Sequence, residues 1–108
     1  MTIADFQKVS LRIGTILEAA EHPNADRLLV LQVELSGEPP ERRQVVAGIK
    51  AHYAPADLVG RSVIVVANLE PATIRGVESQ GMVLAASQEQ QLTLVIPDRP
   101  IASGSVVK

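Results

Sequence analysis

The sequence predicts an all-β fold: a small closed barrel of five strands, with one short helix between the third and fourth strands. Apolar residues alternate with polar ones in several short segments, glycine and proline turns separate these segments, and one helical segment interrupts them. The 108 residues suffice for one domain, residues 1–108. A domain of this size buries roughly 60–65% of its unfolded surface, so it needs no disulfides to fold.

The first strand is expected after a single helical turn. Thr2 and Asp5 have the spacing of a capping box, which predicts a helix start at the N-terminus. Apolar and polar residues alternate from Val9 onward, and we expect this strand to continue to about Ala20. Gly14 interrupts the alternation, and the apolar phase slips after it. A glycine with a phase slip predicts a bulge or sharp bend, which a small closed barrel requires.

The second and third strands are expected at Leu28–Leu35 and Arg42–Ile49, joined through Ser36–Glu41. A turn at His22–Asp26 precedes them. Alternate residues of the second strand are apolar and share one face, which predicts that this face lines the core. These residues are Leu29, Leu31, Val33 and Leu35.

The helix is expected at Ala54–Val59, with Pro55 near its first position and Gly60 as its stop. The next strand, Ser62–Leu69, is apolar on both faces and therefore belongs inside the barrel. This order of strands and helix suits a five-stranded oligonucleotide/oligosaccharide-binding (OB) fold, with another small β-barrel as the alternative.

A late hairpin is expected from two apolar segments, Met82–Ala86 and Leu92–Ile96, and a closed barrel does not require it. Together with the apolar strand at Val63–Val66, the residues Leu92, Leu94 and Ile96 present more apolar surface than a small barrel can cover. We therefore expect a C-terminal dimerisation extension and a homodimer.

Composition excludes several classes of protein. The chain has no cysteine, which rules out a thiol nucleophile or a disulfide framework and fits a cytoplasmic protein. We expect no signal or transit peptide at its start and no membrane span, because no apolar run is long enough. The formal net charge of -2 argues against coating nucleic acid through a global field. Only Phe6 and Tyr53 are aromatic, so the chain lacks the aromatic surface on which proteins stack the bases of single-stranded nucleic acid.

Little in the chain favours catalysis. His22, Asp26 and His52 are the only candidates for a metal or general-base site, and they are weak evidence because the histidines lie in different turns. His22 precedes a proline in a turn and is expected to face solvent. No nucleophile elbow, phosphate loop or dinucleotide fingerprint is present. We expect no catalytic residue, no metal and no cofactor, and hence no enzyme.

The segment Ala67–Met82 is the strongest candidate for a binding loop. It ends an apolar strand in a polar, glycine-punctuated stretch in which Arg75 and Glu78 bring charge close to Ser79 and Gln80. Binding groups concentrate in loops held by rigid strands, although an ordinary solvated connection is the alternative. Other polar positions have plain structural explanations when they are considered alone: Asn24 and Asp26 in turn chemistry, Arg42 and Arg43 in a charged edge, and Lys50 on the surface.

Four segments in this order and spacing resemble the tRNA-binding-domain family: HPNADRLLVLQVEL, RQVVAGI, VVANLEP and GVESQGMVLAAS. This family includes the free-standing structure-specific tRNA-binding protein and the C-terminal domain of bacterial methionyl-tRNA synthetases. The resemblance covers Asp5 to Lys108, and the motifs are specific in combination. It implies an OB barrel that dimerises through its C-terminal region and holds the outer corner of folded tRNA without choosing an anticodon.

The resemblance also implies a set of tRNA-binding residues, to which one arginine of the preceding loop is added on charge and position. In chain order these residues are Asn24, Arg27, Arg43, Lys50, Arg75, Ser79, Gln80 and Met82. The cations are expected to contact phosphates, and the last three residues ribose and exposed bases. Family members often carry a lysine where this chain has Glu70, and the reversed charge should weaken tRNA binding in a salt-dependent way.

The expected partners are tRNA, a second copy of the chain and an aminoacyl-tRNA synthetase, for which the protein would act as a carrier or cofactor. Two other functions stay open. A related peptide-binding secretion chaperone of the CsaA type uses the same barrel, and Glu70 with the acidic balance favours it slightly. The other open function is that of a dimerising appendix of a methionyl-tRNA synthetase, although Met1 at the domain edge suggests an independent chain.

Overall fold

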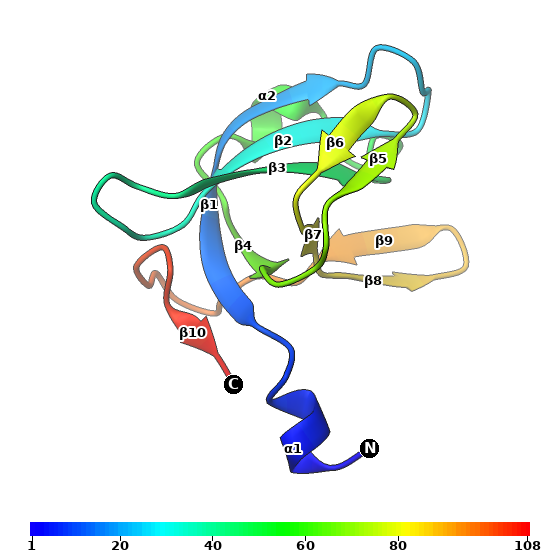
Figure 1. Cartoon of the computed structure of the whole chain (residues 1–108). Helices are drawn as coiled ribbons and strands as arrows, with labels where there is room; N and C mark the ends of the chain where they lie inside the picture. Colours follow the sequence, from blue (N-terminus) through cyan, green and yellow to red (C-terminus); the bar gives the residue numbers. More distant parts are fainter.

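The computed structural model describes all residues, Met1–Lys108, and confirms the predicted fold class. A nearly closed five-stranded antiparallel barrel forms the body of the protein, with a short helix between its third and fourth strands (Figure 1). The elements are α1 (Ile3–Phe6), β1 (Leu11–Glu21), β2 (Leu29–Glu34), β3 (Arg42–Ala47), α2 (Pro55–Leu58), β4 (Ser62–Val66), β5 (Ala72–Ile74), β6 (Val77–Ser79), β7 (Met82–Val83), β8 (Ala85–Gln88), β9 (Gln91–Leu94) and β10 (Val106–Val107). Neither helix is long and apolar enough to cross a membrane.

The barrel strands are hydrogen-bonded in the order β3-β2-β1-β4-β7, and every pair is antiparallel. The predicted core face of the second strand is confirmed, because the four residues assigned to it, Leu29, Leu31, Val33 and Leu35, are all fully buried. They pack with buried residues of the other barrel strands and with Leu58 of α2. The apolar pattern therefore sets which face of each strand turns inward, and the opposite face of β2 and β3 stays available for polar groups.

The N-terminal turn is formed as predicted. Thr2 caps α1 by accepting the Asp5 N–H through its hydroxyl, and the Asp5 carboxylate accepts the Thr2 N–H in return. The hydrogen bond from the Thr2 backbone, with a second one from its side chain, lowers the pKa of Asp5. This capping box fixes the first turn ahead of β1.

The irregularity in β1 lies later than the predicted bulge. The register between β1 and β2 shifts between Ile16 and Glu18, whereas Gly14 is in regular register with Val63 of β4, so of the predicted bulge or sharp bend at Gly14 the bulge is wrong. Gly14 is needed for packing instead, since an added Cβ would overlap Val33 and come within 3.0 Å of Val65 Cγ2. The strand does contain a register shift, but it follows Ile16. Gly14 is required because core side chains approach its backbone closely.

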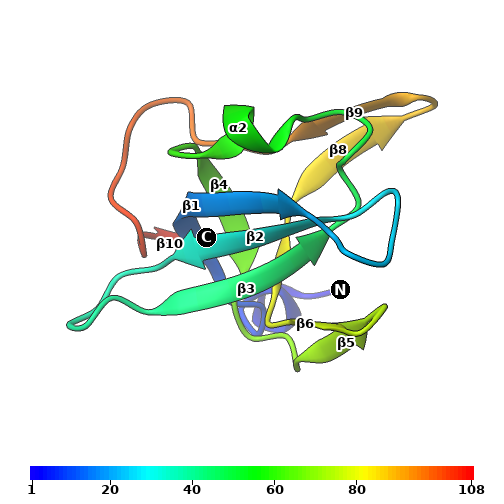
Figure 2. The same cartoon turned by 90° about the horizontal axis from the view of Figure 1, so that it is seen from above.

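The predicted binding loop contains a hairpin of its own. β5 and β6 pair antiparallel, with Ile74 opposite Val77, and Arg75 and Gly76 form the two-residue turn between them. Both turn residues have positive φ, 54° for Arg75 and 89° for Gly76, as a tight hairpin turn requires. The hairpin lies alongside β3 and ends near the turn between β1 and β2 (Figure 2). The polar segment is therefore a structured arm.

The C-terminal segments correct the reasoning behind the homodimer. The late hairpin is present as β8 and β9, and the tail forms β10, an unpredicted strand that pairs with β1. The prediction of excess apolar surface there holds only in part, because Leu94 and Val63 are 5% and 0% exposed whereas Ile96 is 56% exposed. Other exposed apolar side chains gather between α1 and β10, in a groove of about 580 Å³ lined by Ile3, Phe6, Val9, Leu11, Val106 and Val107.

Candidate nucleic-acid interface

Four of the residues expected to bind tRNA lie together at one end of the barrel, and we call them the tip cluster: Asn24, Arg27, Lys50 and Arg75. The Arg75 guanidinium donates to the Asn24 carbonyl at 3.4 Å, which joins the β5–β6 turn to the β1–β2 turn. The Lys50 N–H donates to the Arg27 carbonyl at 3.4 Å, which joins the β1–β2 turn to the segment after β3. Three separate turns thus bring three cations to one end of the protein.

The cations of the tip cluster have few partners within the protein. The Arg27 side chain is exposed and takes part in no hydrogen bond or ion pair. Lys50 Nζ lies 3.6 Å from Glu21 Oε2, but that carboxylate is 64% exposed, so water screens the pair and it contributes little. These charges are available to an external anion.

A polar face adjoins the tip cluster on the outer side of β2 and β3. The Gln32 amide donates to Gln44 Oε1 at 3.0 Å, and the Gln44 amide donates to the Glu78 carbonyl at 2.7 Å. An open cleft of about 350 Å³ lies here, and its lining residues define what we call the polar face: Gln32, Arg42, Gln44, Glu78 and Gln80. In OB folds the face of strands 2 and 3, with the loops beside it, binds oligonucleotides.

Sequence reasoning missed most of the polar face. Gln32 and Gln44 sit opposite each other in the β2–β3 register, and Arg42 is opposite Glu34. The signal was present, because Gln32 and Glu34 alternate with the buried residues of β2 and must therefore point outward. Arg42 and Gln44 follow from the same alternation in β3. The alternation predicted which residues form the core, but no function was inferred for the residues that face outward.

Ser79 and Gln80 close the barrel against β3. The Val46 N–H donates to Ser79 Oγ at 3.0 Å, and the Ser79 hydroxyl donates to the Gly81 carbonyl at 3.0 Å. The Gln80 N–H donates to the Gln44 carbonyl, and Gln80 Oε1 accepts the Gln44 N–H at 2.9 Å. The side-chain oxygens of Ser79 and Gln80 thus accept hydrogen bonds from backbone N–H groups of β3, as the carbonyls of a neighbouring strand would. Ser79 is 3% exposed, whereas the Gln80 amide nitrogen donates to no protein atom and borders the cleft.

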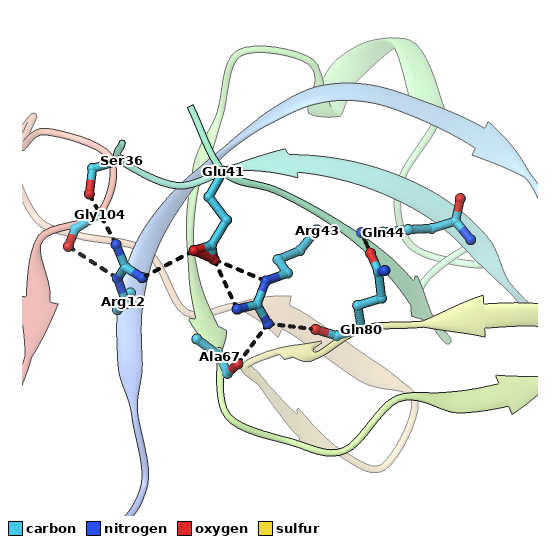
Figure 3. A network of polar contacts seen from close by, with 8 residues as sticks. All are labelled: Arg12, Ser36, Glu41, Arg43, Gln44, Ala67, Gln80 and Gly104. Atoms are coloured by element: carbon cyan, nitrogen blue, oxygen red, sulfur yellow. Dashed lines mark hydrogen bonds and ion pairs between the residues drawn. The ribbon is translucent and has the colours of Figure 1, made fainter. Parts of the chain in front are cut away.

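Arg43 belongs to a polar network at the opposite end of β3 from the tip cluster (Figure 3). Its guanidinium donates four hydrogen bonds: two to Glu41 Oε2, one to the Ala67 carbonyl and one to the Gln80 carbonyl. Arg12 Nη1 lies 4.0 Å from Glu41 Oε1 on the other side of the carboxylate. We call Arg12, Glu41 and Arg43 the arginine network. The structure gives Arg43 the role of holding β3 to the end of β4 and to the β6–β7 connection.

Met82, the last of the expected tRNA-binding residues, is partly buried and packs against the hydrophobic core. The Tyr53 hydroxyl accepts the Leu94 N–H at 3.0 Å, and this hydrogen bond, with one from Thr93, lowers the pKa of Tyr53. Phe6 lies in α1, so neither aromatic side chain belongs to the polar face or the tip cluster. No three His, Asp or Glu side chains gather closely enough to hold a metal ion.

His22 differs from its predicted position. It is only 5% exposed, so the expectation that it faces solvent is wrong. Its Nδ1 accepts the Asn24 N–H at 2.9 Å, and its Nε2 lies 3.0 Å from the Ile74 carbonyl oxygen. A histidine before a proline in a turn carries no sequence signal for burial, because the β5–β6 hairpin that covers it comes from a distant part of the chain.

Comparison with known proteins places this geometry in a family. The family described as "Putative tRNA binding domain" matches residues 11–106. The methionine–tRNA ligase of Pyrococcus furiosus is 47% identical over 108 residues, which are 100% of this chain and 14% of that ligase. The ligase of Thermotoga maritima is 50% identical over 107 residues, 99% of this chain and 16% of that ligase. The chain thus spans about one seventh of the length of these curated relatives.

Solved structures agree with the sequence comparisons. A protein from Pyrococcus horikoshii described as related to methionyl-tRNA synthetase superposes with a TM-score of 0.90 at 30% identity, covering 100% of this chain and 97% of that one. The chaperone CsaA of Bacillus anthracis superposes with a TM-score of 0.88 at 29% identity, covering 100% of this chain and 98% of that one. The resemblance identified in the sequence is therefore confirmed, and the chain belongs to the tRNA-binding-domain family.

Proposed function

We propose that this chain is a structure-specific, sequence-tolerant tRNA-binding protein that holds the outer corner of folded tRNA as a homodimer. The observation that carries the proposal is the continuity of the tip cluster with the polar face, because β3 and β6 run from one to the other. Cations with few protein partners at one end and amides along the adjoining surface are the groups that phosphates and riboses need.

The phosphate contacts fall to four cations, of which three are exposed and Lys50 is half-buried. Arg27, Lys50 and Arg75 come from the tip cluster, and Arg42 at the start of β3 adds a fourth that sequence reasoning did not separate from Arg43. Each can neutralise one phosphate and release condensed counterions, which makes binding salt-dependent. Arg43, Ser79 and Met82 support this surface from within, because their polar or apolar atoms already contact the protein.

Shape selects the ligand in this proposal. The polar face offers amide groups of Gln32, Gln44 and Gln80 but no aromatic ring on which a base could stack. Proteins that bind unstructured single strands depend on such rings, at about 1–3 kcal/mol per stacked base. Phosphate and ribose contacts carry no sequence information, so many tRNA species should bind alike.

The homodimer is proposed to form through the groove between α1 and β10. Ile3 is 74% exposed and Val106 is 71% exposed, and both line this groove together with Phe6 and Val9. Apolar side chains concentrated in one place at such exposure mark an association surface. The family resemblance places dimerisation at the C-terminal region, where β10 lies. A second copy is therefore the proposed occupant, and light scattering that shows only the monomer mass at micromolar concentration would exclude it.

The proposed setting is the cytoplasm, where the protein carries tRNA or serves a synthetase as cofactor or as its appendix, with no catalysis of its own. A peptide-binding chaperone function is the second candidate. The likeness to CsaA favours it, and so does the apolar groove between α1 and β10. The two candidates differ in the physics of binding, since an apolar groove responds little to salt.

Competition on one purified sample tests the proposal. Folded tRNA, single-stranded RNA of equal length and an unfolded peptide are titrated at low salt. Folded tRNA should bind best, and its log K should fall against log salt with a slope of about -3 to -5 if four to six phosphates are neutralised. Tighter binding of the peptide, with little response to salt, would favour the chaperone instead. Equal binding of the single strand would overturn selection by shape.

A further inference from the structure

The β5–β6 hairpin is an arm with two separate attachments. Its base is fixed to β3 through Ser79 and through the Gln44 amide that bonds the Glu78 carbonyl. Its tip is not paired with any strand of the barrel, because β5 and β6 form a two-stranded sheet of their own. All residues of β5 are exposed or half-buried, so apolar packing does little to hold the tip. The tip nevertheless carries Arg75, a cation of the tip cluster.

His22 supplies the attachment of the tip. Its ring lies between the β1–β2 turn, from which it comes, and the β5–β6 hairpin, 52 residues further along the chain. Since the Asn24 N–H donates to Nδ1, the ring hydrogen belongs on Nε2, which then donates to the Ile74 carbonyl. Ile74 directly precedes Arg75. One imidazole therefore bonds the residue beside Arg75 and the backbone of Asn24 at the same time.

Burial makes this bridge specific. His22 is 5% exposed, and no buried side-chain nitrogen or oxygen in the structure lacks a hydrogen-bond partner. Losing either hydrogen bond would leave a buried ring nitrogen without a partner, which costs free energy. The ring therefore holds the two turns at a fixed separation. The only other side-chain bond across this gap is the 3.4 Å contact from Arg75 to the Asn24 carbonyl, which is long and exposed.

We propose that His22 is a positioning residue for RNA binding: it clamps the β5–β6 tip to the β1–β2 turn and so fixes the spacing of Arg75 from Asn24 and Arg27. The proposal rests on the proposed tRNA function for its consequence, while the clamp itself is a property of the free protein. It assigns a function to the one buried imidazole of the chain, which does not touch RNA itself.

Two substitutions of His22 test its two hydrogen bonds separately, because each keeps one of them. Glutamine places its amide nitrogen near the position of Nε2, so His22→Gln keeps a donor for the Ile74 carbonyl. Asparagine places its oxygen near Nδ1, so His22→Asn keeps the acceptor for the Asn24 N–H and loses the bond across the gap. His52→Asn is the matched control, because His52 is exposed and its side chain makes no hydrogen bond.

Amide hydrogen exchange of the β5–β6 hairpin, without RNA, measures the clamp, and titration with folded tRNA measures its consequence. In His22→Asn we expect exchange at the tip to rise about three- to tenfold and tRNA affinity to fall by a similar factor, as the loss of one net hydrogen bond allows. His22→Gln should exchange and bind within about twofold of wild type, and so should the control.

The outcomes separate the clamp from the proposed function. Unchanged tip exchange in His22→Asn would overturn the clamp, whatever the protein binds. Faster tip exchange with unchanged tRNA affinity would overturn the positioning role. Equal losses in His22→Gln and His22→Asn would show that His22 serves only to fill space. If wild type fails to bind tRNA, the proposed function and the positioning role fail together, and the exchange data still decide whether the clamp exists.

Discussion

The two ends of β3 carry the same kind of side chain and use it differently. At the start of the strand, Arg43 directs four hydrogen bonds to acceptors within the protein. Past its other end, Lys50 lies beside Arg27, whose side chain bonds nothing in the protein. The difference shows that a motif arginine can be structural or can be a ligand-binding group, and that its partners within the fold decide which.

The electrostatics of the two ends follow from their partners. Glu41 lies between Arg12 and Arg43, so the arginine network carries its own counter-charge close to the guanidinium groups. In the tip cluster only Lys50 has a carboxylate within ion-pair distance, and that carboxylate is mostly exposed. A phosphate approaching the tip cluster therefore meets uncompensated charge, whereas one approaching the arginine network would have to displace bonds that hold β3.

The largest expected effect concerns stability. Arg43→Ala removes four hydrogen bonds and leaves the Ala67 and Gln80 carbonyls without that donor. We expect the free energy of unfolding to fall by about 2–3 kcal/mol. This is less than the cost of removing one partner of a fully buried ion pair, because the Arg43 side chain is partly exposed. Urea denaturation measures it. Arg42→Ala is the matched control, and its exposed side chain predicts a change below about 0.5 kcal/mol. Equal losses in the two variants would contradict the contrast.

The next effect concerns affinity. Arg27→Ala and Lys50→Ala should each weaken folded tRNA about three- to tenfold at low salt, alike for different tRNA species, because they remove phosphate contacts. Thermal unfolding should shift little for Arg27→Ala, since its side chain has no partner. An Arg99→Ala protein is the control, as that exposed arginine lies in the tail far along the chain from both turns. A loss specific to one tRNA would argue for base readout instead.

Arg75 allows stability and affinity to move in opposite directions. Its φ of 54° is unfavourable for an arginine, and asparagine followed by glycine is the preferred pair for such a turn. Arg75→Asn should therefore raise the free energy of unfolding by about 0.5 kcal/mol while weakening tRNA about threefold. Denaturation and titration on the same sample test both signs. A variant that gains stability and keeps full affinity would remove Arg75 from the tip cluster.

The smallest effects come from acidic residues. Glu78 lines the cleft of the polar face, so Glu78→Gln should tighten tRNA binding about twofold by removing repulsion from phosphate. Glu70 sits in the turn after β4, where Asn68 bonds the backbone of Ser10 and Lys8, away from the tip of the hairpin. Glu70→Lys should accordingly tighten binding less than Glu78→Gln. The reverse order, measured at equal salt, would place position 70 on the RNA surface.

The sequence predicted the strands better than it predicted the site. Alternation placed the core face of β2, and the capping residues placed α1, because both signals are local. The roles of His22 and Arg43 depend on partners from distant segments, such as Ile74 and Gln80, and no local pattern reports them. β10 was missed for the same reason, since two valines near the end of the chain form a strand only because β1 offers them an edge.

The salt dependence of tRNA binding in three proteins tests the central claim most directly: that the exposed cations hold phosphate and the arginine network does not. Wild type should show a slope of log K against log salt of about -3 to -5. Arg27→Ala should flatten that slope by about one. Arg43→Ala, measured where it is folded, should keep the wild-type slope even if its affinity falls. A slope flattened as much by Arg43→Ala as by Arg27→Ala would contradict the account.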